Sequence, residues 1–253
     1  MIGIFDSGVG GLTVYKEIAK ALPNEDIIYL GDTKQFPYGN KSKETIIELT
    51  KKNIEFLISK NVDIIVIACG TATSQALEEV KQNYNIPIIG IIQPTINELE
   101  KDLNTENIGV IATTGTIRSN SWEKEIKKVL PSTNVINKAC PLLAQMAEEG
   151  WTTNEIAKLT IKEYLKVFEN KSIQKLILGC THYPLFKEII REELGDAVEI
   201  INTGENVAEY LKNIIKTSID GKGKHEFYLT DLETEFLRVA KNLLEEEIEL
   251  KKA

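Results

Sequence analysis

The feature that most constrains this chain is a repeated alternation of two kinds of segment. Short apolar runs rich in β-branched residues indicate buried strands at residues 1–5, 27–30, 64–68, 86–92, 108–112, 135–137, 176–178 and 198–201. Between most of them lie longer amphipathic segments with helical spacing, such as 44–60 and 157–168. Strands that alternate with helices predict parallel sheets covered by helices on both faces, which is the α/β class.

The strand ends indicate an internal duplication. IGIFDSG (2–8) resembles IGVIATTG (108–115), and IIVIACGT (64–71) resembles KLILGCTH (175–182). Because the two offsets are nearly equal, they favour two similar α/β units in tandem over a chance likeness among Ile- and Val-rich strands. We therefore expect two similar doubly wound domains with mainly parallel sheets.

The crossing between the units is expected in IIQPTINELE (91–100), where Pro94 should end a strand and a helix should begin. The C-terminal segment HEFYLTDLETEFLRVAKNLL (225–244) predicts one more strand and a closing helix. Periodicity alone assigns this tail to neither unit.

Composition excludes several classes of function. The formal net charge of −8 is spread along the chain without a basic stripe, so nucleic acid is not expected as a primary partner. The first residues lack the basic region of a secretory signal, and no window approaches the roughly 18 apolar residues of a membrane span. Cys69, Cys140 and Cys180 are widely spaced, which argues against disulfides and a zinc site and fits a reducing cytoplasm.

Cys69 stands at the end of one expected strand, in IIVIACGTATS (64–74), followed by a turn and a helix that should begin near Thr73. Open α/β sheets bind ligands at such strand ends, yet free cysteine is also among the most buried residue types. On this stretch alone, a buried and inert cysteine is the favoured interpretation.

A glycine-rich turn, DSGVGGLTV (6–14), should join the first strand to a helix and direct backbone N–H groups at an anion. It is not a dinucleotide-binding fingerprint, because Thr13 fills the third glycine position, and it lacks the Lys of a P-loop. A small carboxylate suits it better than a nucleotide. The alternative is a tight turn in which Asp6 acts as a structural cap.

A second strand end, GCTHYPL (179–185), carries Cys180, Thr181 and His182. A histidine two residues from a cysteine is a candidate acid–base partner for the thiol, although a lone histidine is more often structural. A Cys–His protease needs one thiol and an orienting Asn or Asp, whereas this chain has two equivalent cysteines. The pair favours a reaction with two similar proton carriers.

Six segments together resemble the aspartate/glutamate racemase family, and its glutamate-specific members in particular: GIFDSGVGGLTV, GDTKQFPYG, IACGTATS, IGVIATTGTIRS, ACPLLAQMAEEG and LGCTHYPL. The resemblance implies an isomerase that needs no cofactor and no metal, and that interconverts L- and D-glutamate. D-glutamate is used in bacterial peptidoglycan, so a cytoplasmic enzyme of cell-wall biogenesis is implied. Its partner would be glutamate itself, with a homodimer as the candidate assembly.

The resemblance also implies roles for individual residues. Cys69 would act on D-glutamate with help from Asp6, and Cys180 on L-glutamate with help from His182. The substrate-holding positions would be Asp6, Ser7, Pro37, Tyr38, Gly39, Gly70, Thr71, Thr113, Thr116 and Thr181. Cys140 is expected to be a core residue.

The family fold implies a first domain of residues 1–94 plus 207–253, a second of 95–206, and an active site in the cleft between them. Two positions depart from the family pattern. Gly70 stands where asparagine is usual, and Asn202 where aspartate is usual. Gly70 is expected to enlarge one side of the pocket, which leaves open a racemase for aspartate or another acidic amino acid, or an impaired homologue that only binds amino acids.

Overall fold

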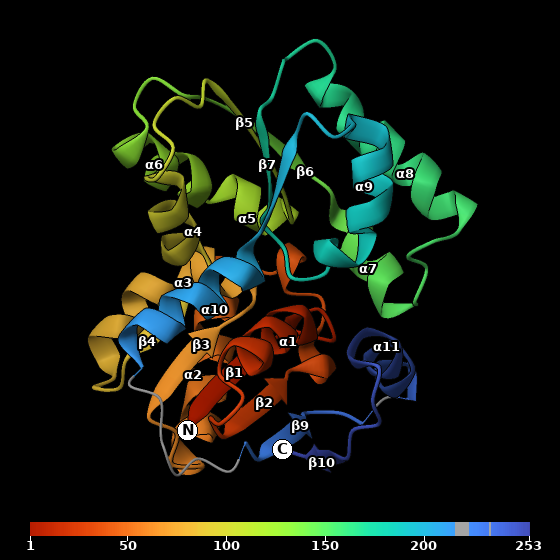
Figure 1. Ribbon diagram of the computed structural model, residues 1–253. Helices are drawn as coiled ribbons and strands as arrows, with labels where there is room; N and C mark the ends of the chain where they lie inside the picture. Colours follow the sequence, from red (N-terminus) through yellow and green to blue (C-terminus); the bar gives the residue numbers. More distant parts are fainter. Residues whose placement is uncertain (216–222, 233) are drawn as a thin grey trace.

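Two parallel sheets form the framework of the computed structural model, which describes residues 1–215, 223–232 and 234–253 (Figure 1). The first sheet has the order β10-β9-β2-β1-β3-β4, with strands β1 (Ile2–Asp6), β2 (Ile27–Gly31), β3 (Ile64–Ile67), β4 (Ile88–Gly90), β9 (His225–Leu229) and β10 (Leu250–Lys252). The second has the order β6-β5-β7-β8, with β5 (Asn107–Ala112), β6 (Asn134–Ala139), β7 (Lys175–Leu178) and β8 (Glu199–Asn202). All of these pairings are parallel, which confirms the predicted α/β class.

Helices cover both faces of each sheet (Figure 1). On the first sheet, α1 (Gly11–Ala21), α10 (Thr203–Ile214) and α11 (Thr234–Leu244) pack on one face, and α2 (Lys43–Ser59) and α3 (Gly70–Asn83) on the other. On the second, α4 (Ile92–Leu99) and α6 (Ser121–Val129) face α7 (Pro141–Glu148), α8 (Glu155–Leu165) and α9 (Lys187–Leu194) across the sheet. The short helix α5 (Thr114–Arg118) follows β5.

The strands are continuous apolar runs because both of their faces are buried. In β1, Ile4 belongs to the core under α1, whereas its neighbour Phe5 belongs to the core under α2 and α3. All five residues of β1 are buried. This double burial explains why the strands are visible in the sequence as runs of Ile and Val rather than as an alternation.

The two sheets share one arrangement, since β2-β1-β3-β4 and β6-β5-β7-β8 are equivalent orders. The predicted duplication is thereby confirmed at the level of topology. Phe5 pairs with Ile67 and Ile111 with Leu178, so β1 and β3 end level with each other, as do β5 and β7. Parallel strands therefore deliver their following residues to one edge of each sheet.

Two local expectations change, and the place of the C-terminal tail, which periodicity left open, is now given by its strand pairing. Strand β4 ends at Gly90 and α4 begins at Ile92, so Pro94 lies in the first helical turn, where its missing N–H would have no partner in any case. The helix after Cys69 begins at Gly70 rather than near Thr73. The C-terminal tail returns to the first sheet, where β9 pairs with β2. The predicted domain boundaries, 1–94 with 207–253 and 95–206, stay a prediction.

Candidate active site

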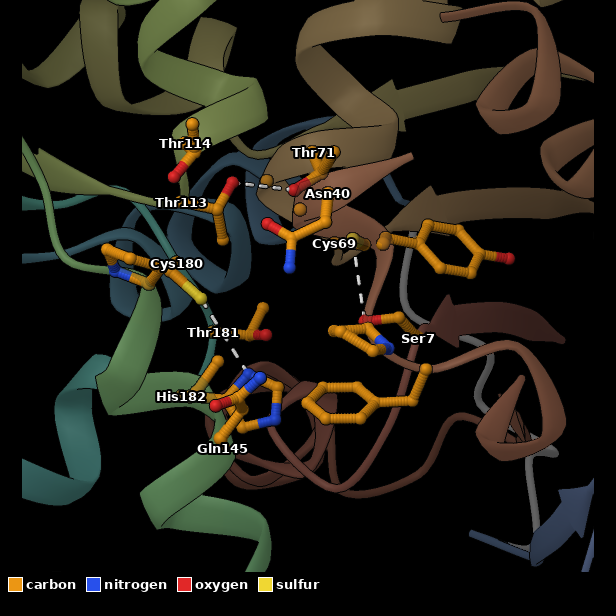
Figure 2. Close-up of a pocket in the computed structure, with 17 residues that line it drawn as sticks. Ser7, Asn40, Cys69, Thr71, Thr113, Thr114, Gln145, Cys180, Thr181 and His182 are labelled. Atoms are coloured by element: carbon orange, nitrogen blue, oxygen red, sulfur yellow. Dashed lines mark hydrogen bonds between the residues drawn. The ribbon is translucent and has the colours of Figure 1, made fainter. Parts of the chain in front are cut away.

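The carboxyl ends of the two sheets meet at one closed pocket (Figure 2). Its first wall consists of lining residues between 7 and 71, including Cys69 after β3, and its second wall of lining residues between 113 and 182, including Cys180 after β7. Each of these two cysteines is only 5% exposed. The water-accessible volume is about 30 Å³. One water needs roughly 10–15 Å³ by this measure, so the pocket has room for about two waters, and its lining residues Asn40, Pro141 and Gln145 are exposed to solvent.

Most of the predicted site residues lie together in this pocket. Its wall includes the predicted Ser7, Pro37, Tyr38, Gly39, Gly70, Thr71, Thr113, Thr181 and His182. Asp6 and Thr116 are buried behind the wall and reach it only through their neighbours. Sequence reasoning missed six further lining residues, Phe36, Asn40, Thr114, Pro141, Ala144 and Gln145.

Cys69 is held as a neutral thiol. Its Sγ donates to Ser7 Oγ across 3.8 Å, the contact drawn in Figure 2. Burial raises the pKa of the Cys69 thiol well above its usual range, and the nearby carboxylate of Asp6 raises it further. A protonated sulfur facing a closed pocket is suited to deliver a proton.

Asp6 lies beneath the pocket, fully buried between the two walls. Its Oδ2 accepts hydrogen bonds from the N–H groups of Gly8 and Gly11, both at 3.1 Å, and its Oδ1 accepts the Thr181 hydroxyl at 3.2 Å. Burial raises the pKa of Asp6 from 3.8 to about 6, against the opposing effect of His182. The carboxyl can therefore change protonation state near neutral pH.

Cys180 faces a histidine that is itself held by a carboxylate. His182 Nδ1 lies 3.7 Å from Cys180 Sγ, and His182 Nε2 lies 2.6 Å from Glu148 Oε1. Burial alone would lower the pKa of His182, but its hydrogen bonds to Cys180 and Glu148 raise it well above its usual value. A cationic imidazolium beside a sulfur stabilises negative charge on that sulfur. The second wall is thus suited to accept a proton.

Glu148 is the functional residue that sequence reasoning missed most clearly. Besides His182, its Oε1 accepts the N–H of Val9 at 2.8 Å, so α7 is tied to the glycine-rich turn. Together with Asp6, it occupies the N–H groups of Gly8, Val9 and Gly11. The expected carboxylate site of this turn is therefore filled by the protein's own carboxylates.

Three threonine hydroxyls join the two walls above the cysteines. Thr71 Oγ1 lies 2.8 Å from Thr113 Oγ1, the contact drawn in Figure 2. Thr113 Oγ1 in turn lies 2.9 Å from Thr116 Oγ1. Thr71 belongs to α3 and Thr113 caps the N-terminus of α5, so the cluster bridges the two sheets. Hydroxyls rotate freely, and those of Thr71 and Thr113 can turn toward a carboxylate in the pocket.

The loop that supplies Phe36 to Asn40 is fixed by a buried polar network. Tyr38 donates its hydroxyl to Asp32 at 2.5 Å and accepts a hydrogen bond from Asn53 at 2.9 Å. Thr230, after β9, also donates to Asp32 at 2.9 Å. Since these partners come from three elements, the loop is held rigidly against the pocket.

Gly70 does not enlarge the pocket, contrary to expectation. The backbone carbonyl oxygen of Gly179 lies nearer to the place where a Gly70 side chain would begin than real Cβ atoms approach any neighbour.

Asn202 has a structural role: its Oδ1 accepts the Gly204 N–H at 3.0 Å and caps α10. Cys140 is fully buried in the core under α7 to α9.

Two features are absent from the described residues, a metal-binding cluster and a membrane-spanning helix. No group of three His, Cys, Asp or Glu side chains there could hold a metal ion. No helix in residues 1–215, 223–232 or 234–253 combines the length and apolar character needed to cross a membrane.

The chain is similar to known proteins in both sequence and fold. Residues 2–211 match the family described as Asp/Glu/Hydantoin racemase. A glutamate racemase of Sulfurihydrogenibium sp. is 46% identical over 252 residues, which is 99% of this chain and 96% of the relative. The structure is similar to glutamate racemase from Aquifex pyrophilus (TM-score 0.85, 44% identity, 100% and 98% of the chains) and to that of Francisella tularensis in complex with D-glutamate (0.91, 38%, 100% and 96%).

Proposed function

The chain belongs to the Asp/Glu/hydantoin racemase family, and from that premise we propose that it is a glutamate racemase working through two opposed thiols. The observation that carries the proposal is the unequal environment of Cys69 and Cys180 in one closed pocket. Relatives named glutamate racemase, one of them solved with D-glutamate, support glutamate as the substrate.

In the direction from L- to D-glutamate, Cys180 is the base. Its thiolate, beside the His182 cation, takes the Cα proton, while the Cys69 thiol gives its proton to the opposite face of the same carbon. The products are D-glutamate, a Cys180 thiol and a Cys69 thiolate. This form of the enzyme is the one that converts D-glutamate back to L-glutamate. Before a second turnover from L to D, proton transfer through His182 and Asp6 must restore the Cys180 thiolate and the Cys69 thiol.

The Cα proton is very weakly acidic, so the pocket must stabilise carbanion-like charge in the transition state. The hydroxyls of Thr71 and Thr113 are placed to bind substrate carboxylates, and the small closed volume excludes bulk water. Because about 30 Å³ is too little for glutamate, the walls must part for substrate to enter.

The proposal has structural and cellular parts. The substrate would bind between a domain of residues 1–94 with 207–253 and a domain of residues 95–206. The D-glutamate formed in the cytoplasm would be used for peptidoglycan. The aspartate alternative rested on a pocket widened at Gly70, and that space is filled by the Gly179 carbonyl.

Chiral analysis of product formed from L-glutamate tests the proposal, with L-aspartate as the comparison substrate and the C140A protein as the control variant. We expect D-glutamate from the wild type and from C140A. The kcat/KM for glutamate should be at least about a hundredfold above that for aspartate, because the side chain of aspartate is one methylene shorter and its displaced carboxylate leaves polar groups of the pocket unpaired. A folded wild-type protein that forms no D-glutamate contradicts the proposal.

A further inference from the structure

At Gly70 the first wall packs directly against backbone of the second wall. Gly70 is the first residue of α3, directly after Cys69. The carbonyl oxygen of Gly179, directly before Cys180, lies where a Cβ atom on Gly70 would stand. The next atom that such a Cβ would meet outside Gly179 is Ile91 Cδ1 at 3.5 Å, an ordinary contact. The obstruction therefore comes from the opposite wall alone.

The obstructing carbonyl cannot easily move aside. The Gly179 N–H donates to Ile111 O at 2.8 Å, which continues the pairing of β7 with β5. A Cβ atom on Gly179 would itself lie 2.7 Å from Trp122 Nε1 and 3.1 Å from Ile111 O. Gly179 is thus held by strand β5 and packs closely on Trp122 of α6.

Other glycines of the first wall also pack on the second wall, but against side chains. Gly8 packs on the end of the flexible Glu148 side chain, and Gly10 on the ring of His182. Side chains can rotate away from a new methyl group, whereas a backbone carbonyl held in a sheet moves only with the sheet. Gly70 is therefore a position at which a side chain would hold the walls apart, and its obstruction is tighter than that at Gly115, where a Cβ would lie 2.9 Å from the Gly39 carbonyl oxygen.

We propose that Gly70 is a positioning residue: its missing side chain allows the Cys69 wall to close fully on the Cys180 wall. The predicted effect of this closure on catalysis rests on the proposed function. The closure itself is a property of the unliganded protein and can be measured separately.

The contact is well placed to set the spacing of the two sulfurs, because each glycine is the chain neighbour of one cysteine. Neighbouring Cα atoms are 3.8 Å apart, so a shift at the glycines passes almost undiminished to both cysteines. A methyl group at Gly70 needs on the order of 1 Å of extra separation. A misplacement of about 1 Å at reacting groups lowers rates about a hundredfold.

Alkylation of the cysteines in Gly70→Ala tests the closure without substrate. Iodoacetamide labelling, followed peptide by peptide by mass spectrometry, reports how often each thiol becomes accessible. We expect Cys69 and Cys180 to be labelled about ten times faster than in the wild type. Cys140 is fully buried in the same core cluster as Cys180 but does not line the pocket, so it should keep its wild-type rate, which verifies that the variant is folded.

Ser74→Ala is the matched control, one turn further along α3, where the side chain donates only to Thr71 O. Cys69 and Cys180 of this variant should be labelled at the wild-type rates. Labelling rates of Cys69 and Cys180 that are the same in Gly70→Ala as in the wild type would overturn the inference.

Kinetics give a second test where the wild type racemises glutamate. The kcat of Gly70→Ala should then fall about a hundredfold with unchanged thermal unfolding, and a kcat equal to that of the wild type would also overturn the inference. An inactive wild-type protein instead contradicts the proposed function and leaves the labelling result to decide closure.

Discussion

Glu148 Oε1 lies 2.6 Å from His182 Nε2 and 2.8 Å from the N–H of Val9, so one carboxylate oxygen joins the second wall to the glycine-rich turn of the first. His182 in turn faces Cys180 at 3.7 Å. The contact that raises the pKa of this histidine thus lies within the second wall, and the same carboxylate oxygen also ties that wall to the first.

Replacing Glu148 by glutamine should weaken catalysis through His182. Glutamine keeps an acceptor for Val9 but removes the negative charge, so the pKa of His182 falls and its cation is lost at a lower pH. We expect kcat/KM to fall by about 10- to 100-fold, the size of one charge-assisted hydrogen bond. In pH profiles, the alkaline loss of activity should move to lower pH.

The matched control for this change is Glu149→Gln, since Glu149 is the exposed neighbour of Glu148. Its pH profile should overlay that of the wild type. A Glu148→Gln protein whose rate falls at every pH without a shift of the alkaline limb would show that Glu148 acts only as a structural link.

Single cysteine variants should separate the two half-reactions. Cys69→Ala lacks the proton donor of one face, so racemisation should fall by about 10²- to 10⁴-fold. Cys180 can still exchange the Cα proton of L-glutamate with deuterated water at retained configuration. Cys180→Ala should show the mirror behaviour with D-glutamate. NMR of the Cα signal checks both, and exchange of both enantiomers by either variant would argue against one base for each face.

Asp6→Asn should change how stability depends on pH. The folded-state pKa of Asp6, about 6, exceeds its ordinary 3.8, so the folded protein binds this proton more tightly than the unfolded chain. The free energy of unfolding must then fall as pH rises from about 4 to 6, and stay lowered above it. The asparagine variant lacks this effect.

Thermal unfolding of the two proteins therefore supplies the comparison. Relative to the wild type, Asp6→Asn should gain on the order of 2 kcal/mol between pH 4 and pH 7.5, at about 1.4 kcal/mol for each unit of pKa. A stability difference that is the same at both pH values would contradict the raised pKa.

Thr113→Val should weaken substrate binding more than it slows the chemical step. The hydroxyl lies 2.8 Å from that of Thr71 and can bind a carboxylate in ground and transition states alike. We expect KM to rise about 10-fold or more with kcat nearly unchanged, and Thr113→Ser to restore KM. A loss confined to kcat would assign the hydroxyl to the transition state.

The sequence predicts most of the strands, and the positions of Cys69 and Cys180 at strand ends, because these features depend on local pattern. Strand β3 was expected at 64–68 and spans Ile64–Ile67, since an apolar run buried on both faces is unambiguous. Strand β10 (Leu250–Lys252) gave no such signal, because it is a partly exposed edge strand with two lysines, held by backbone pairing to β9.

Glu148 and Gly70 could not be interpreted from the sequence, because their roles depend on contacts between distant segments. Glu148 meets Val9 across 139 positions of the chain, and beside Glu149 it carries no distinguishing mark. Gly70 suggested extra space because a missing side chain normally leaves some. Only the position of Gly179 shows that the space is taken.

The most direct test of the two-thiol account is the position of deuterium at the start of the reaction. The wild-type protein is incubated with L-glutamate in deuterated water, and both enantiomers are separated and weighed by mass spectrometry at low conversion. With one thiol for each face, the D-glutamate formed should carry deuterium at Cα, while the remaining L-glutamate keeps its proton. D-glutamate that retains the original proton, or deuterium that appears equally in both enantiomers, would contradict the account.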